Sequence, residues 1–307
     1  MKKIALYFLV PLLVGLLLTG CGTATNDQAK EPQPPASQDK KAILVVSFGT
    51  SYPDARKACI ESTENKIKDT FKDYQTRRAF TSDIIIKKLA DRDKLMVDDP
   101  EQALTKLQQE GYKQVVVQPL HIIPGKEFDD LKAVVDKFTA DKAFDKLVLG
   151  RPLLGYQIDP NNTKDFDVAV DALKKQLPAL QEKQIVVFMG HGTEHQSNTA
   201  YQMMNDKLKQ ANLPAIVGTV EGSPTLEEVK ASLAQLQVQD VTLMPLMLVA
   251  GDHANNDMAG DEEDSWKTQL KKEGYTVTPY LHGLGENEAI QAIFVQHTQD
   301  AIDQLSK

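Results

Sequence analysis

Short runs of β-branched and other apolar residues recur along this chain of 307 residues, separated by longer segments with helical spacing. The clearest runs, residues 42–48 and 185–189, are apolar almost throughout, which is typical of strands buried on both faces. The expected strands are residues 42–48, 76–80, 113–118, 147–149, 185–189, 215–220, 241–249 and 276–280. The expected helices begin at Pro53 and after Ser82, and then cover residues 100–110, 127–140, 165–175, 201–210, 226–236, 264–272 and 288–305. This alternation predicts an α/β fold with mostly parallel sheets.

The second half of the chain repeats motifs of the first. Residues 47–50 (SFGT) align with residues 190–193 (GHGT), and residues 119–127 (PLHIIPGKE) align with residues 245–253 (PLMLVAGDH). The chain therefore reads as two diverged copies of one unit. We expect two similar α/β halves, each a mostly parallel sheet flanked by helices. Their expected bounds are residues 41–160 and 161–307.

The aligned copies differ at the residues that can carry chemistry. Phe48 stands opposite His191, and Glu127 stands opposite His253. The histidines at these two positions occur in the second copy alone. We therefore expect the second half to carry the chemistry and the first half to form a lid or wall.

The first forty residues have the pattern of an export signal followed by a tether. Lys2 and Lys3 precede an apolar run at residues 4–18, which is short for a membrane span and typical of a signal peptide. The run ends in LTGC at Cys21, which resembles the lipobox of bacterial lipoproteins. We expect a signal peptide at residues 1–20, a lipid on Cys21 and a flexible tether over residues 21–40; an uncleaved anchor helix is the alternative. The folded part would then lie outside the cytoplasm, on the periplasmic side in a bacterium with two membranes.

Composition excludes some partners. The formal net charge is -8 and the basic residues are scattered, so the chain lacks the features of a nucleic-acid-binding protein. After removal of the signal, Cys59 is the remaining thiol besides the lipidated Cys21. We expect no internal disulfide and a Cys59 that is simply packed against its helix.

Three residues stand just beyond three expected strands of the second half: His191, Glu221 and His253. The carboxyl ends of neighbouring parallel strands meet at one edge of a sheet, which is where ligands bind in open α/β folds. Two imidazoles and one carboxylate would form an open site for a divalent ion such as Co, Ni, Zn or Fe. From spacing alone, the alternative for each histidine is a hydrogen-bonded or surface residue.

A set of long motifs adds a family resemblance to this interpretation. From Lys41 to its end the chain resembles the anaerobic-type sirohydrochlorin cobaltochelatases, the CbiK family of class II tetrapyrrole chelatases. The motifs that carry the resemblance are ILVVSFGTSY (43–52), RAFTS (78–82), VFMGHG (187–192), LMPLMLVAGDHA (243–254), NDM (256–258), DSWK (264–267) and GLGEN (283–287). It implies two α/β domains with a tetrapyrrole cleft between them. It also implies a metal chelatase, a lyase that inserts Co2+ into sirohydrochlorin with loss of two protons, without a nucleotide or redox cofactor.

By this resemblance the family's metal ligands fall on His191, Glu221 and His253. We assign catalytic roles to His191, as proton acceptor and metal ligand in succession, and to Glu221. Because such ligands suit several divalent ions, Fe2+ and Ni2+ are alternatives to Co2+, and a bound haem is a further alternative.

Sirohydrochlorin is a polycarboxylate, so local donors are needed to orient it within an acidic protein. Thr50, Ser51 and Thr193 stand at expected strand-to-helix turns, where backbone N–H groups favour anions. His121 and His195 are further candidates for substrate contact. Basic candidates are Arg56, Arg78, Lys87, Lys126 and Arg151, for which a solvated surface charge is the alternative; His282 and His297 are expected on the surface.

An exported chelatase is unexpected, because cobalamin precursors are made inside the cell. The alternative function is an extracytoplasmic lipoprotein that binds a metal, a tetrapyrrole or haem and serves a transporter. A homo-oligomer is compatible with either function.

Overall fold

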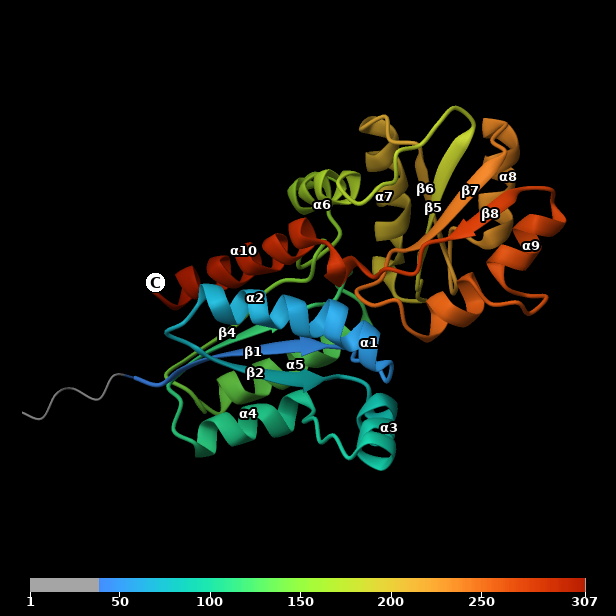
Figure 1. Cartoon of the computed structure of the whole chain (residues 1–307). Helices are drawn as coiled ribbons and strands as arrows, with labels where there is room; N and C mark the ends of the chain where they lie inside the picture. The colour runs from blue at the N-terminus through green and yellow to red at the C-terminus, as the bar shows by residue number, and fades with distance from the viewer. Residues whose placement is uncertain (1–38, 307) are drawn as a thin grey trace, which may run out of the picture. The chain divides into compact units, whose positions relative to one another are not determined.

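The computed structural model describes residues 39–306, which form two four-stranded sheets in which every strand pair is parallel (Figure 1). The first sheet has the order β2-β1-β3-β4 and the second the equivalent order β6-β5-β7-β8. The first sheet contains β1 (Lys41–Ser47), β2 (Gln75–Phe80), β3 (Gln114–Pro119) and β4 (Lys146–Leu149). The second sheet contains β5 (Gln184–Gly190), β6 (Ala215–Thr219), β7 (Asp240–Pro245) and β8 (Thr276–Pro279). The predicted pair of similar α/β halves is confirmed.

The predicted helices form with small shifts at their ends. They are α1 (Pro53–Ala55), α2 (Ser62–Thr70), α3 (Asp83–Asp93), α4 (Pro100–Gln109), α5 (Lys126–Ala140), α6 (Lys164–Lys174), α7 (Thr199–Gln210), α8 (Leu226–Leu236), α9 (Trp266–Lys272) and α10 (Glu288–Leu305). Ser82 caps α3 by accepting a hydrogen bond from the N–H of Ile85, as its position in the sequence predicts. Local capping and apolar spacing therefore determine most helix boundaries.

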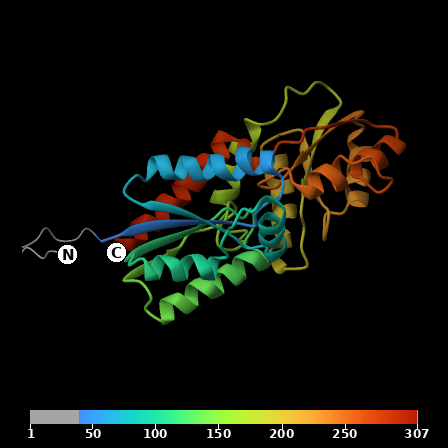
Figure 2. The ribbon, with the colours of Figure 1, turned by 60° about the horizontal axis from the view of Figure 1, so that its bottom comes forward.

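The central strands β1 and β5 are buried on both faces, which explains their unbroken apolar sequences. In β1, Ile43 and Val45 face one hydrophobic cluster while Leu44 and Val46 face another. The first of these clusters also receives residues of β5, so one hydrophobic core runs through both halves. Figure 2 shows α4 and α5 on one side of the first sheet and α2 and α10 on the other.

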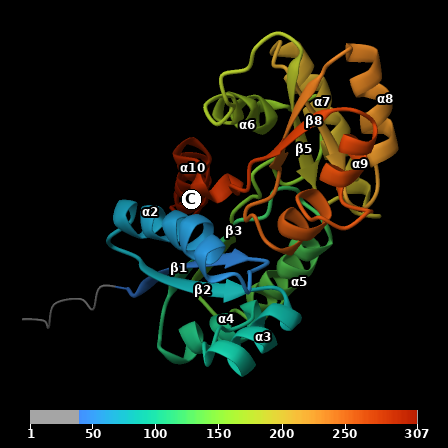
Figure 3. The same cartoon turned by 45° about the vertical axis from the view of Figure 1, so that its right-hand side comes forward.

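The last helix, α10, packs against the first half although it ends the chain. It contacts α2, β3 and β4 of the first half, and α6 (Figure 3). Arg151 ties this packing together, because it pairs with Asp165 of α6 at 2.9 Å and with Asp300 of α10 at 2.7 Å. The surface position predicted for His297 is wrong: this face of α10 is turned into the protein, and His297 is 2% exposed.

Two other local predictions need correction. The predicted strand 241–249 ends at Pro245, and the apolar residues after it, such as Leu246 and Leu248, are buried in a loop rather than in the sheet. The helix from Pro53 contains a π-helical stretch, η1 (Arg56–Glu61), that the sequence pattern did not indicate. Cys59 lies in this stretch and is fully buried as predicted, and burial raises the pKa of its thiol to about 12.

The predicted signal peptide, the lipidated Cys21 and nearly all of the tether lie outside the described residues. Among residues 39–306, no helix has the length and apolarity that a membrane span requires.

Candidate metal site

His191 follows β5 directly, in a loop whose conformation depends on the glycines on both sides of it. The ring of Tyr201 packs so closely on Gly190 that a β-carbon there would collide with it. Gly192 has a φ of +82°, and a β-carbon on it would meet the backbone carbonyl of Glu221. Gly190 therefore makes room for Tyr201 of α7, and Gly192 allows the loop after β5 to lie directly against the loop after β6.

The rings of His191 and His253 meet edge to face, with their centroids 4.7 Å apart and an interplanar angle of 89°. His253 immediately precedes a short helical stretch, η3 (Ala254–Met258), and reaches His191 from the loop after β7. Its side chain is 35% exposed, so an ion can approach it. The structure thus brings two of the three predicted ligands together.

Hydrogen bonds orient both imidazoles in the same way. Nδ1 of His253 lies 2.6 Å from Oδ2 of Asp257, and Nδ1 of His191 lies 2.8 Å from the carbonyl oxygen of Gly192. Because carboxylate and carbonyl oxygens only accept hydrogen bonds, Nδ1 carries the proton in each neutral ring. The lone pair of each neutral imidazole is then on Nε2, the nitrogen that can bind a metal ion.

The main chain of Glu221 is hydrogen-bonded to His191, but the Glu221 side chain does not form a three-residue metal site with the two histidines. The N–H of Glu221 donates to the carbonyl oxygen of His191 over 2.7 Å, while its side chain is exposed. Within residues 39–306, no three His, Cys, Asp or Glu side chains lie close enough together to hold a metal ion. The three-ligand site therefore stays a prediction.

The hydroxyl-bearing residues predicted to bind substrate carboxylates are engaged in local hydrogen bonds. Thr50 and Ser51 are 4% and 3% exposed, and Oγ1 of Thr50 accepts from the N–H of Tyr52 over 3.2 Å. The N–H of Thr193 donates to Oδ1 of Asn198 over 3.1 Å. These bonds stabilise the two turns, and substrate contact by the three residues stays a prediction.

His195 links the two halves. Its Nδ1 accepts from the N–H of Ser197 over 3.2 Å, and its Nε2 lies 3.2 Å from Oδ2 of Asp129 in α5. The ring thus uses one nitrogen to cap a turn of the second half and the other to contact the first half.

His121 lies just after β3 and is held in an apolar setting. Neither ring nitrogen has surface accessible to water, and neither has a hydrogen-bond partner among the described residues. Burial lowers the pKa of His121 to about 4, although Glu127 opposes this, so the ring is neutral at pH 7. A contact between His121 and substrate stays a prediction.

Two acidic residues near the site were not among the predicted site residues. Asp257 orients His253, and its place four residues after that histidine on a helical turn was a usable signal. Burial raises the pKa of Tyr201, whose hydroxyl accepts a hydrogen bond from the N–H of Gly192, and the charge of Glu127 adds to this rise. In the sequence, the alignment of Glu127 with His253 could have indicated that Glu127 lies close to the site.

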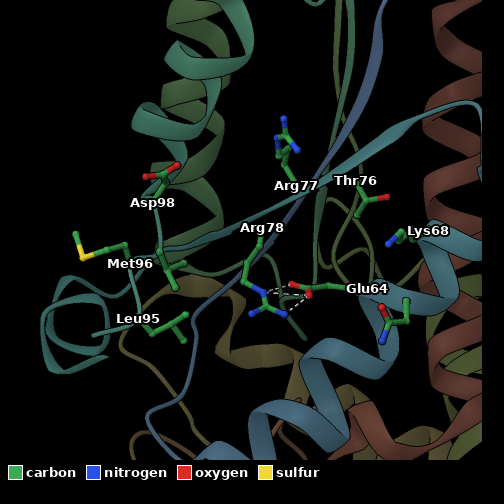
Figure 4. A pocket seen from close by; sticks show the side chains of 10 residues that line it. Glu64, Lys68, Thr76, Arg77, Arg78, Leu95, Met96 and Asp98 are labelled. Atoms are coloured by element: carbon green, nitrogen blue, oxygen red, sulfur yellow. Dashed lines mark hydrogen bonds and ion pairs between the residues drawn. The ribbon is translucent and has the colours of Figure 1, made fainter. Parts of the chain in front are cut away.

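Several of the basic candidates are occupied by acidic partners. Arg78 forms a two-pronged pair with Glu64, in which Nε lies 2.7 Å from Oε1, at the wall of a pocket of about 350 Å³ (Figure 4). Arg151 is held by Asp165 and Asp300, and Lys126 pairs with Asp130 at 2.5 Å. These ion pairs stabilise the first half and its contact with α10.

Comparison with known proteins identifies a family for this arrangement. A family model described as cobalt chelatase (CbiK) matches residues 41–303. The chain is 44% identical over 264 residues to the sirohydrochlorin cobaltochelatase of Salmonella typhimurium, covering 86% of this chain and 97% of that protein. It is 35% identical over 276 residues to the sirohydrochlorin cobaltochelatase CbiKC of Nitratidesulfovibrio vulgaris, covering 90% of this chain and 95% of that protein.

Solved structures support the fold. SirB from Bacillus subtilis, solved with Fe3+, superposes with a TM-score of 0.58 at 16% identity, over 87% of this chain and 98% of SirB. A multi-domain protein of Deinococcus radiodurans with structural similarity to chelatases superposes with a TM-score of 0.54 at 10% identity, over 86% of this chain and 56% of that chain. At these identities the likeness concerns the chelatase-like fold alone.

Proposed function

Since the chain belongs to the cobalt chelatase (CbiK) family, we propose that it is a sirohydrochlorin cobaltochelatase. It inserts Co2+ into the sirohydrochlorin macrocycle, and two pyrrole protons leave as four ring nitrogens take the ion. This is the cobalt-insertion step of anaerobic cobalamin biosynthesis. The observation that carries the proposal is the pair of imidazoles at His191 and His253, whose ring centroids lie 4.7 Å apart.

The site binds Co2+ through the Nε2 atoms of His191 and His253. Asp257 and the Gly192 carbonyl hold the Nδ1 protons and so keep both rings in the tautomer that a metal ion needs. Donation of the Nδ1 proton of His253 to the Asp257 carboxylate also raises the basicity of the imidazole. Two fixed ligands that leave other positions open suit a substrate ion, because a closed four-ligand cage would retain it.

We assign the third ligand position to Glu221. The backbones of Glu221 and His191 are already joined by a hydrogen bond, so rotation of the exposed Glu221 side chain is the movement needed for its carboxylate to approach the histidines. The carboxylate would lower the net charge of the bound ion and favour Co2+, Fe2+ or Ni2+ over softer metals. Which of these ions is used then depends on supply.

Proton removal requires a base that the metal does not occupy. A neutral imidazole has one free lone pair, so Nε2 of His191 can accept a pyrrole proton or bind the ion, but cannot do both at once. We assign the two roles to His191 in succession: it binds the ion first and accepts one of the two pyrrole protons as the ion passes to the macrocycle, while the second proton leaves to solvent water. His253, fixed by Asp257, keeps its metal contact during this exchange.

The lipobox-like LTGC at Cys21 supports a further proposal, that the enzyme is displayed outside the cytoplasm on a lipid anchor. Cobalt insertion outside the cytoplasm would require sirohydrochlorin that is exported or taken up. We therefore propose a tetrapyrrole transporter as the partner of the anchored enzyme.

The test is to mix the purified full-length chain with sirohydrochlorin and Co2+ and to follow the absorption change of the macrocycle. We expect a rate well above that of the spontaneous reaction. Tight binding of Co2+ and sirohydrochlorin without an increased rate would refute the proposed chelatase activity. The alternative function, a lipoprotein that binds the metal or the tetrapyrrole for a transporter, would then be favoured. Repeating the assay with Fe2+ and Ni2+ ranks the three metals.

A further inference from the structure

Two contacts cross between the halves at equivalent positions of the internal repeat. Tyr52 follows Phe48 by four residues, as His195 follows His191, so the two residues occupy the same place in their copies. The hydroxyl of Tyr52 donates to Oδ1 of Asp252 over 3.0 Å. On the other side, Nε2 of His195 lies 3.2 Å from Asp129. Each half therefore holds the segment that follows the third strand of the other: residues just before η3 in the second half, and the first turn of α5 in the first half.

The glycines that precede these acidic residues confirm how closely the loops approach. Gly251 and Gly125 are equivalent in the internal repeat. A β-carbon on Gly251 would lie 3.6 Å from Oγ1 of Thr50, and one on Gly125 would lie 3.6 Å from Oγ of Ser197. The halves thus pack through reciprocal contacts that extend beyond a single hydrogen bond.

The two contacts differ in what their loops carry. Asp252 immediately precedes His253, and Oδ1 of Asp252 also accepts from the side-chain amide of Asn256 over 3.1 Å. The hydroxyl of Tyr52 is therefore joined to the helical turn in which Asp257 orients His253. The hydrogen bond to Asp252 raises the pKa of Tyr52, so the phenol stays protonated and donates at neutral pH. The loop held by His195 carries no histidine at the equivalent position, because Glu127 stands there.

We infer that Tyr52, a residue of the half without the metal histidines, is a positioning residue that holds the His253 loop in place for Co2+ binding. This inference rests on the proposed function for its role in turnover. Tyr52 acts through Asp252 and fixes where the imidazole of His253 stands relative to His191. The first half thus completes the metal site of the second without supplying a ligand to it.

The test is a Co2+ titration of the full chain with Tyr52→Phe, which removes the hydroxyl and keeps the ring. We expect the Kd for Co2+ to rise about five- to ten-fold, which corresponds to the net contribution of one typical hydrogen bond. The KM for Co2+ should rise by the same factor, while kcat at saturating Co2+ stays within about two-fold. The visible absorption bands of bound Co2+ should shift, because the geometry at His253 changes. A Kd within two-fold of the unaltered chain, with unchanged bands, would overturn the inference.

Three further variants separate positioning from general damage. Asp252→Ala removes the acceptor of the Tyr52 hydroxyl and should raise the Kd for Co2+ at least as much as Tyr52→Phe does; a Kd within two-fold of the unaltered chain would show that Tyr52 does not act through Asp252. Tyr74→Phe is the matched control, because the Tyr74 hydroxyl forms no hydrogen bond within the described part of the chain. Asp129→Ala removes the reciprocal contact and should leave the Kd within two-fold; an equal loss there would show that overall docking of the halves sets the affinity.

The same experiment distinguishes this inference from the proposed function. If the unaltered chain binds Co2+ but metallates no sirohydrochlorin, the chelatase proposal fails, and the titration still decides the role of Tyr52 in metal binding. If the unaltered chain is active and Tyr52→Phe matches it in Kd and KM, the positioning role fails alone.

Discussion

His191 and His253 stand edge to face with their ring centroids 4.7 Å apart, although they follow different strands and belong to loops of different length. Both rings direct Nδ1 to an oxygen acceptor and leave Nε2 for a metal ion. This shared orientation is the structural basis for the predictions on metal binding.

Replacement of either histidine should abolish most of the activity. We expect His191→Ala and His253→Ala each to lower the rate of cobalt insertion by roughly 100-fold or more, because loss of a direct ligand costs more than the 10- to 100-fold typical of a residue that orients one. The rate is measured from the macrocycle absorption. His282→Ala is the control, since His282 is an exposed histidine paired with Glu286. Equal rates in all three variants would refute the assignment of the site.

Removal of the carboxylate behind His253 should weaken metal binding without removing a ligand. We expect Asp257→Ala to raise the Kd for Co2+ by about 10- to 100-fold, because Nδ1 loses its acceptor and the ring loses its fixed tautomer. Calorimetric titration measures the change. Asp261→Ala serves as the control, because Asp261 pairs with Lys267 at the surface. Unchanged affinity in Asp257→Ala would mean that His253 is not a metal ligand in this orientation.

His121 should make the protein less stable in mild acid. Burial lowers its pKa from 6.5 to about 4, so the unfolded chain binds a proton in this range that the folded chain does not. Above pH 6.5 His121 is neutral in both states and costs the folded protein nothing. As the pH falls from 6.5 toward 4, protonation of His121 in the unfolded chain lowers the free energy of unfolding. His121→Phe removes this titration, and between pH 7.5 and pH 5 it should lose about 2 kcal/mol less stability than the unaltered chain. Urea unfolding at both pH values measures the difference, and parallel losses would show that His121 is protonated in the folded state.

Two neighbouring arginines of β2 should differ sharply in their contribution to stability. Arg78 pairs with Glu64, whose side chain is 12% exposed, whereas Arg77 pairs with Glu110 at the surface with 40% and 45% of the two side chains exposed. Arg78→Ala leaves a largely buried carboxylate without its partner and should cost about 2 kcal/mol of unfolding free energy. Arg77→Ala should cost less than about 1 kcal/mol. Denaturant unfolding measures both, and equal costs would mean that Glu64 finds another partner or water.

The export prediction is tested at Cys21. Cells that express the chain should incorporate labelled fatty acid into it, while Cys21→Ser should abolish the labelling. Labelling that persists in Cys21→Ser would contradict the lipobox interpretation.

The amino-acid sequence alone was sufficient to predict the parallel α/β halves and the position of His191. Strands such as β1 and β5 are apolar throughout because both faces are buried, and that pattern is local and readable. The alignment of the two sequence copies makes β1 equivalent to β5 and β3 equivalent to β7, and the equivalent strand orders of the two sheets support this. The family resemblance rests on contiguous motifs for the same reason, since its longest motifs run from a strand into the loop after it.

The tertiary structure decided which residues meet across long stretches of chain. The return of α10 to the first half buries His297, and the contact between Tyr52 and Asp252 joins the two copies; neither has a periodic signature. Such contacts depend on how whole elements pack, and packing is the sum of many weak interactions that no local pattern records. The sequence therefore indicated the two histidines and the sheet edge where they stand, while only folding determined their 4.7 Å separation and the residues that hold them there.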